Sequence, residues 1–400
     1  MTRKIPHSGG VRALPITSIH AAIAALFAAA APSALALTQV TSFGSNPGNL
    51  LMYKFVPPNP GTSPRTLVVA LHGCNQSASS YQSSGWTQLA DKHNFYVVYP
   101  QQQMSNNYSR CFNWFEPGDI ARGQGEALSI KQMVDKMKTD HNIAADRVFV
   151  TGFAAGGFMS VVMAATYPDV FAGAAPIAGG PYKCAVGTTL MNSCMNPGVN
   201  KTPAQWGDLL RGGYPGYTGR KPAASIWHGT SDSTIKSSNL TELMEQFTNY
   251  HGGDQIPDQT DFNGQFNWYT NGQGMYMVGT WLIANMGHGV PVDPGGGWQQ
   301  CGNAGTAMPD VNICASFQIG RTFGFIQPWA PTPTPTDPNA GPCYTSSNYT
   351  HVSAGRAYNS LGYAKAVGSN QNMGENNVYI FRSLRKTSTN YYVIDLTCPQ

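Results

Sequence analysis

The chain has 400 residues, of which only 11% are charged, against a typical share of about 25%. Its formal net charge is +4, with 44 glycines and 28 prolines among many amide and hydroxyl side chains. This composition favours an extracellular protein over a nucleic-acid binder, so we expect no nucleic-acid partner. Nothing in the composition points to a cofactor, and we expect the protein to act as a monomer.

The first 36 residues have the pattern of a secretory signal peptide. A basic start precedes the apolar run AAIAALFAAAAPSALA, and the A-x-A site at its end predicts cleavage after Ala36. A membrane anchor is the alternative, but the run is short for a span and Pro32 interrupts it. Cleavage removes three basic residues and no acidic ones, which lowers the net charge from +4 to +1. We expect a secreted, extracellular protein without a membrane partner.

From residue 66 on, strand patterns alternate with helix patterns. The predicted strands are TLVVALHG (66–73), FYVVYP (95–100), RVFVTG (147–152), FAGAAPIAG (171–179), AASIWHG (223–229) and YMVGTWLIAN (276–285). The predicted helices are GWTQLADKHN (85–94), GEALSIKQMVDKMKTDH (125–141), GGFMSVVMAATYP (156–168) and NLTELMEQFTNY (239–250). This alternation predicts an α/β fold in which helices cover both faces of a mostly parallel sheet.

The turn GFAAG, residues 152–156, has the layout of a nucleophile elbow. A strand leads into it and an apolar helix follows, as in the G-x-S-x-G motif of α/β-hydrolases. Ala154 stands where that motif has its nucleophilic serine. The sequence therefore predicts a hydrolase scaffold that has a methyl group in place of the reactive hydroxyl.

Two later residues complete a triad in the chain order of α/β-hydrolases. Asp232 follows the strand at 223–229, and His288 lies in a glycine-flanked loop after the strand at 276–285. The histidine would act as general base and acid, and the aspartate would orient it. Alone, each residue fits an ordinary turn, and only their order and placement make the prediction specific. Asp293 is a weaker rival for the acid because no strand precedes it.

Two backbone amides are the predicted oxyanion hole. One belongs to Ala155, directly after the nucleophile position, and the other to Cys74 in the loop LHGCNQ after an early strand. His72 and His228 end strands before a glycine, and we interpret both as structural or supporting residues.

Eight cysteines in an exported chain predict disulfides. No C-x-x-C pair or His/Cys cluster indicates zinc, so we expect no metal. Other pairings remain open from the sequence alone. Pairing sequence neighbours gives Cys74–Cys111, Cys184–Cys194, Cys301–Cys314 and Cys343–Cys398.

A change of composition near residue 328 predicts two domains. We expect a catalytic α/β-hydrolase domain at 37–327, a Pro/Thr linker at 328–342 and a small β-rich domain at 343–400, stapled by a disulfide and binding polymer. Tyrosines of this last part either form a flat adsorbing face or pack within a small sheet: Tyr358, Tyr363, Tyr391 and Tyr392.

Residues 51–326 resemble the secreted family of poly(3-hydroxybutyrate) depolymerases and related feruloyl and acetylxylan esterases. The resemblance rests on LHGCNQSASSY, CFNWF, GQGEALSIKQMVDKM, IWHGTSD, MGHGVPVDPG and the long run after RVFVTG. It implies that serine is usual at Ala154 and that Asp232 and His288 are the family's acid and histidine. The linker and C-terminal part resemble those of polyester depolymerases, which favours a polyester substrate over plant cell-wall esters.

Several alternatives follow from Ala154. The intact Asp232 and His288 favour a deliberate Ser→Ala replacement in a polyester esterase over a natural, non-catalytic polymer-binding protein. A feruloyl or acetylxylan esterase scaffold is the third reading. Trp114 and Trp227 either line the acyl pocket or pack in the core.

Overall fold

The computed structural model of the chain describes residues 1, 35–326, 341–360, 363–376 and 381–394. The predicted signal peptide (1–36) and linker (328–342) fall almost entirely outside the described residues. In the part of the chain that is described, no helix is long and apolar enough to cross a membrane.

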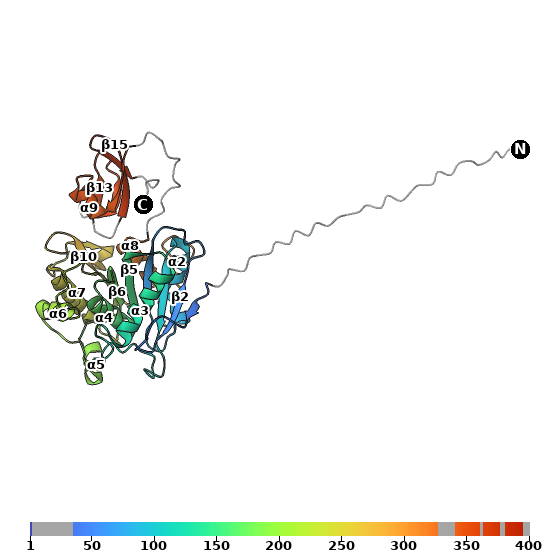
Figure 1. Cartoon of the computed structure of the whole chain (residues 1–400), viewed down its shortest axis with the longest axis vertical. Coiled ribbons are helices and arrows are strands. Elements are labelled where there is room, and N and C mark those ends of the chain that lie inside the picture. Colours follow the sequence, from blue (N-terminus) through green and yellow to red (C-terminus); the bar gives the residue numbers. More distant parts are fainter. Residues whose placement is uncertain (2–34, 327–340, 361–362, 377–380, 395–400) are drawn as a thin grey trace. The chain divides into compact units, whose positions relative to one another are not determined.

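A ten-stranded sheet in the order β1-β2-β4-β3-β5-β6-β7-β10-β9-β8 forms the centre of residues 35–326 (Figure 1). The six strands from β4 to β10 in this order are parallel, and antiparallel strands extend both edges. The strands are β1 (Thr38–Val40), β2 (Leu51–Phe55), β3 (Arg65–Leu71), β4 (Tyr96–Gln101), β5 (Ile143–Phe153), β6 (Gly173–Ile177), β7 (Ala223–Gly229), β8 (Gln259–Asp261), β9 (Phe266–Thr270) and β10 (Tyr276–Ile283).

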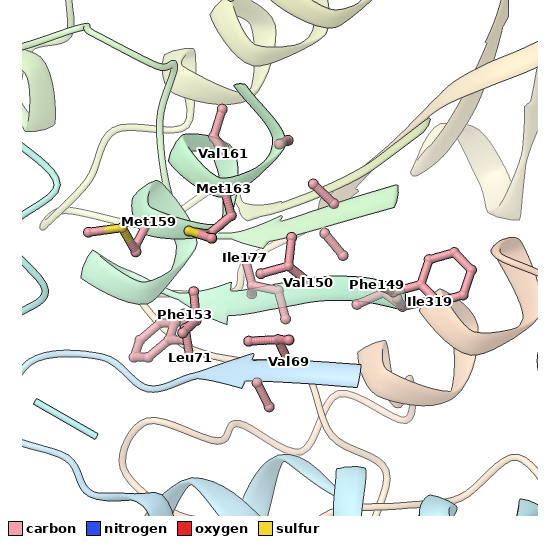
Figure 2. Packing of buried hydrophobic residues seen from close by; sticks show 14 of the residues in the cluster. Val69, Leu71, Phe149, Val150, Phe153, Met159, Val161, Met163, Ile177 and Ile319 are labelled. Atoms are coloured by element: carbon pink, nitrogen blue, oxygen red, sulfur yellow. The ribbon is translucent and has the colours of Figure 1, made fainter. Parts of the chain in front are cut away.

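Helices cover both faces of this sheet, as predicted. Side chains alternate between the faces along a strand, so Phe149 and Gly152 of β5 point to opposite sides. Gly152 faces α4, whereas Phe149 stacks on Phe323, just after α8, with ring centroids 4.9 Å apart. Figure 2 shows Phe149 beside Ile319 of α8. The helices and 3₁₀ turns are α1 (Ala78–Tyr81), η1 (Gln82–Ser84), α2 (Trp86–His93), α3 (Gly125–Asp140), α4 (Ala155–Thr166), α5 (Thr188–Met195), α6 (Pro203–Arg211), α7 (Ser238–His251), η2 (Phe262–Gly264) and α8 (Ala315–Thr322).

The described C-terminal residues form two small antiparallel sheets, in agreement with the predicted β-rich character. Their shared core is small, and the predicted partner of Cys343, Cys398, lies outside the described residues. One sheet contains β11 (Cys343–Ser347), β15 (Phe381–Ser388) and β16 (Tyr391–Ile394), the other contains β12 (Ala357–Ser360), β13 (Tyr363–Ala366) and β14 (Asn372–Glu375), and α9 spans Asn348–Ser353.

Three of the predicted disulfides are present, and each fixes a loop next to the regular elements. Cys74–Cys111 joins the loops that follow β3 and β4. Cys184–Cys194 ties the segment after β6 to α5, and Cys301–Cys314 closes the loop before α8. Because a cross-link restricts the unfolded chain, each stabilises the folded loop that it closes.

The start of α4 lies directly against the end of β3. A Cβ added at Gly156 would lie 2.3 Å from the carbonyl oxygen of Leu71 and 2.5 Å from that of His72. No flexible side chain stands between these backbones to relieve such a contact. Glycine at 156 is therefore a condition for the helix to begin where it does.

We expect Gly156→Ala to destabilise the protein by about 1–3 kcal/mol, because the added methyl group must displace backbone. Gly118→Ala is the matched control, since a Cβ there meets nothing within 4 Å. Urea unfolding of both variants measures the difference. Equal stability of the two would contradict the close approach described here.

Candidate active site

The junction between β5 and α4 holds residue 154 in a strained backbone conformation. Ala154 has φ +52° and ψ −115°, a region that side-chain-bearing residues rarely adopt and that costs about 1–3 kcal/mol. Its N–H donates to the carbonyl of Ile177 at 3.0 Å, and its carbonyl accepts from the N–H of Phe158 at 3.0 Å. These bonds to β6 and α4 fix the sharp turn that the G-x-S-x-G pattern predicts.

The structure brings Asp232 and His288 together. Asp232 follows β7 and His288 follows β10, and these strands are parallel neighbours, so their loops meet at one edge of the sheet. Nδ1 of His288 lies 2.7 Å from Oδ2 of Asp232. Backbone bonds join the two loops, because Thr230 N–H donates to Ile283 O at 3.0 Å and Ser231 N–H to Met286 O at 2.9 Å.

Asp232 is held as an ionised carboxylate. Its side chain is fully buried, and Oδ1 accepts backbone N–H groups of Thr234 and Ile235, each at 2.9 Å. Burial by itself would raise the pKa, but the side chains of His228 and His288 and the Ile235 amide outweigh it and hold the pKa of Asp232 well below its ordinary value. The charged acid therefore accepts the Nδ1–H of His288, which leaves Nε2 of that ring available.

The ring of His288 lies beside the elbow. Its centroid is 4.7 Å from that of Phe153, the residue directly before Ala154, and 21% of its side chain is exposed. Figure 2 shows Phe153 at the end of β5 next to Leu71 of β3. Phe153 thus packs the imidazole against the end of β5, a contact that sequence reasoning did not foresee because the two residues are far apart in the chain.

The two predicted oxyanion amides have no hydrogen-bond acceptor among the described residues. Ala155 is buried at the first position of α4, where a helix leaves its amides unpaired. Cys74 lies in the loop after β3 and is bridged to Cys111. Both N–H groups are therefore free to donate a hydrogen bond.

His72 orients the loop that carries Cys74. Burial lowers the pKa of His72 to about 4, so the ring is neutral near pH 7. Its Nδ1 lies 2.7 Å from Gly73 O, and the N–H of Gln102 reaches its Nε2 at 3.1 Å. The proton therefore sits on Nδ1, and the ring joins the end of β3 to the end of β4.

A buried carboxyl group, Glu126 at the start of α3, organises the loop that follows β4. Its Oε2 accepts the N–H of Asn113 at 2.9 Å, and its Oε1 accepts the side chain of Gln102, which also donates to Cys111 O at 3.1 Å. Burial and the nearby Asp119 raise the pKa of Glu126 to about 8, although these hydrogen bonds oppose the change. Glu126 therefore supports the loop that bridges to Cys74.

The remaining predicted residues are Trp114, Trp227 and Asp293. Trp114 is nearly buried and stacks on Phe158 of α4, with ring centroids 3.8 Å apart. Trp227 is fully buried within β7 and stacks on Trp281 at 4.6 Å, which favours core packing over a pocket wall. The rival acid Asp293 accepts the side chain of Gln300 at 3.0 Å, whereas Nδ1 of His288 points to Asp232.

Fold and elbow together define an α/β-hydrolase, and sequence comparison narrows the class. Residues 50–258 match the model of the esterase PHB depolymerase family. The chain is 61% identical over 304 residues to poly(3-hydroxyalkanoate) depolymerase C of Paucimonas lemoignei, covering 75% of this chain and 73% of that protein. It is 37% identical over 262 residues to an acetylxylan esterase of Coprinopsis cinerea, covering 64% and 69%.

A solved structure agrees with this assignment. The acetyl xylan esterase from Aspergillus awamori has a TM-score of 0.57 and 31% identity, and the match covers 63% of this chain and 94% of that chain. The chain belongs to the esterase PHB depolymerase family and has the scaffold of a carboxylic ester hydrolase.

Glu126 predicts a pH-dependent contribution to stability. Its pKa is about 8 when folded and 4.5 as the ordinary value, so its favourable contribution is complete below pH 4.5 and is lost as pH rises towards 8. The Glu126→Gln variant does not lose stability in this way, because glutamine does not ionise. We expect the stability of the variant relative to the parent to increase from pH 4.5 to 8, by up to about 1.4 kcal/mol per pH unit.

Denaturant unfolding of the parent and of Glu126→Gln at several pH values between 4.5 and 8 measures this slope. Parallel stability curves would show that Glu126 ionises equally in the folded and the unfolded protein.

Proposed function

We propose that this chain is the scaffold of an extracellular serine esterase acting on poly(3-hydroxybutyrate) or its oligomers, and that Ala154 makes this form inactive. The observation that carries the proposal is the 2.7 Å contact between Nδ1 of His288 and Oδ2 of Asp232, with the His288 ring packed on the neighbour of Ala154. The 61% identity to a poly(3-hydroxyalkanoate) depolymerase supports the polyester. The disulfides and the N-terminal sequence pattern support secretion.

With serine at 154 the reaction is an acyl transfer in two steps. The hydroxyl oxygen attacks the ester carbonyl carbon while Nε2 of His288 takes its proton, and Asp232 stabilises the resulting imidazolium. The N–H groups of Cys74 and Ala155 bind the oxyanion, and His288 then gives the proton to the departing alcohol. Water repeats the sequence on the acyl-enzyme, releasing the acid and the free serine.

Alanine stops this sequence at its first step. A methyl group has no lone pair to attack the ester and no proton to give to His288, so no acyl-enzyme forms. Loss of a triad nucleophile lowers turnover on the order of a million-fold. Asp232 and His288 are both present and lie 2.7 Å apart, which supports a deliberate Ser→Ala replacement over a natural non-catalytic protein.

The C-terminal part, with domain limits at 343–400, is proposed to adsorb the polymer. Tyr358 and Tyr391 are 40% and 41% exposed, whereas Tyr363 and Tyr392 are partly buried. Exposed tyrosine rings offer an apolar face with a polar rim, which suits a polyester of uncharged carbonyls and methyl groups.

We expect Ala154→Ser to gain hydrolysis of polyester granules by about a million-fold over the parent, because the hydroxyl completes the triad. Release of soluble hydroxy acid from granules measures it. Asp232→Asn and His288→Gln, each added to Ala154→Ser, are the controls and should remove most of the gain. If Ala154→Ser hydrolyses no ester while granule binding persists, the chain is a non-catalytic polymer-binding protein.

A second candidate substrate is an ester of plant cell-wall polysaccharide. The 37% identity to an acetylxylan esterase and the likeness to the solved acetyl xylan esterase favour it. We expect the Ala154→Ser protein to have a higher kcat/KM on hydroxybutyrate oligomers than on methyl ferulate or acetylated xylan. The reverse order of kcat/KM values would assign the scaffold to cell-wall esters.

A further inference from the structure

A second histidine faces the acid of the candidate triad. His228 is the penultimate residue of β7, its side chain is fully buried, and its Nε2 lies 3.4 Å from Oδ2 of Asp232. The same Nε2 lies 2.8 Å from the carbonyl oxygen of Ile235. His228 therefore links the end of the strand to both the carboxylate and the far side of the loop that holds it.

The surroundings of Nε2 determine where the His228 ring carries its proton. Both neighbouring groups are acceptors, the Ile235 carbonyl and the Asp232 carboxylate, so Nε2 must be the protonated nitrogen. The Ile235 carbonyl takes the short hydrogen bond, and the carboxylate meets the same N–H at longer range. The proton is thus shared between a neutral and a charged oxygen.

The other nitrogen of this ring has an unusual environment. Nδ1 of His228 is buried and has no hydrogen-bond partner among the described residues. A buried polar atom without a partner destabilises the fold, and a leucine at this place would avoid that penalty. Packing alone therefore does not account for histidine here, whereas an N–H directed at Ile235 and Asp232 does.

N–H groups from three segments of the chain surround the carboxylate of Asp232. His288 approaches from the loop after β10, His228 from β7, and the amides of Thr234 and Ile235 from its own loop. Oδ1 is taken by the two amides, so both imidazoles compete for Oδ2. Every N–H near a carboxylate oxygen reduces the negative charge that it presents to its other partners.

We propose that His228 is a positioning residue that acts through Asp232, fixing the carboxylate and limiting the charge that Oδ2 presents to His288. This inference rests on the proposed function and adds a residue that influences its general base, His288. With His228 present, Oδ2 presents less negative charge to the imidazolium of His288.

The test that needs no catalysis is a pH titration of the His288 ring by histidine-selective NMR in the Ala154 protein. We expect His228→Leu to raise the midpoint of that titration by about 0.5–1 pH unit, because Oδ2 loses a competing N–H. His228→Gln keeps an N–H near the place of Nε2 and should restore most of the original midpoint. The His288 signal is assigned by its loss in His288→Gln.

His251 provides a matched control. It is also buried, and its Nε2 lies 2.8 Å from the carbonyl of Pro222, directly before β7 and about 20 Å along the strand from His228. His251→Leu should lower stability without moving the His288 midpoint. An unchanged midpoint in His228→Leu, or an equal change in both Leu variants, would overturn the proposal.

Two further readouts keep the proposal testable. If His228→Leu does not fold, the ¹⁵N spectrum of the parent still tests the proposal, because an N–H on Nδ1 of His228 in place of Nε2 would overturn it. In the Ala154→Ser protein, His228→Leu should move the acid limb of kcat/KM to higher pH with KM for a soluble ester unchanged. An inactive Ala154→Ser protein would contradict the proposed function but not the role of His228, because the titration of the His288 ring needs no catalysis.

Discussion

The close approach of three backbones at one turn is the constraint on which the rest of the site depends. The first turn of α4 begins against the carbonyl groups at the end of β3, at a distance that only glycine at 156 allows. The chain must therefore reverse between β5 and α4 within a single residue, and Ala154 takes the strained φ of +52°. The surroundings, including the bond from its N–H to Ile177, hold that strain in place.

Parallel strands bring Asp232 and His288 to the same edge of the sheet. Asp232 and His288 come from loops after β7 and β10, which are neighbours in the sheet although 56 positions separate the residues. The buried carboxylate is kept charged by donors from three directions, and it in turn sets the tautomer of His288. Charge, ring orientation and elbow are thus fixed by elements of the fold rather than by contacts with a substrate.

The sequence predicts the central sheet and the chain order of the candidate triad because both leave local signals: alternating apolar runs, a glycine-rich turn, and polar residues after strands. It does not predict the antiparallel edges, since β8 has only three residues and β9 reads as an irregular aromatic segment. The sequence also does not show which residues distant in the chain pack on one another. Nothing near Trp227 indicates that Trp281 covers it, and the roles of Glu126 and His228 depend on partners from other loops.

The turn at Ala154 depends on main-chain groups and not on the side chain of this residue. The strained φ and ψ belong to the backbone, and the bonds that hold them run from main-chain groups to Ile177 and Phe158. No side-chain atom takes part in these bonds, so the turn does not depend on a hydroxyl group at position 154. A fold under no demand for this turn would gain from glycine at 154, which adopts positive φ without strain. Alanine at 154 therefore carries the strain that any residue with a side chain has in this conformation.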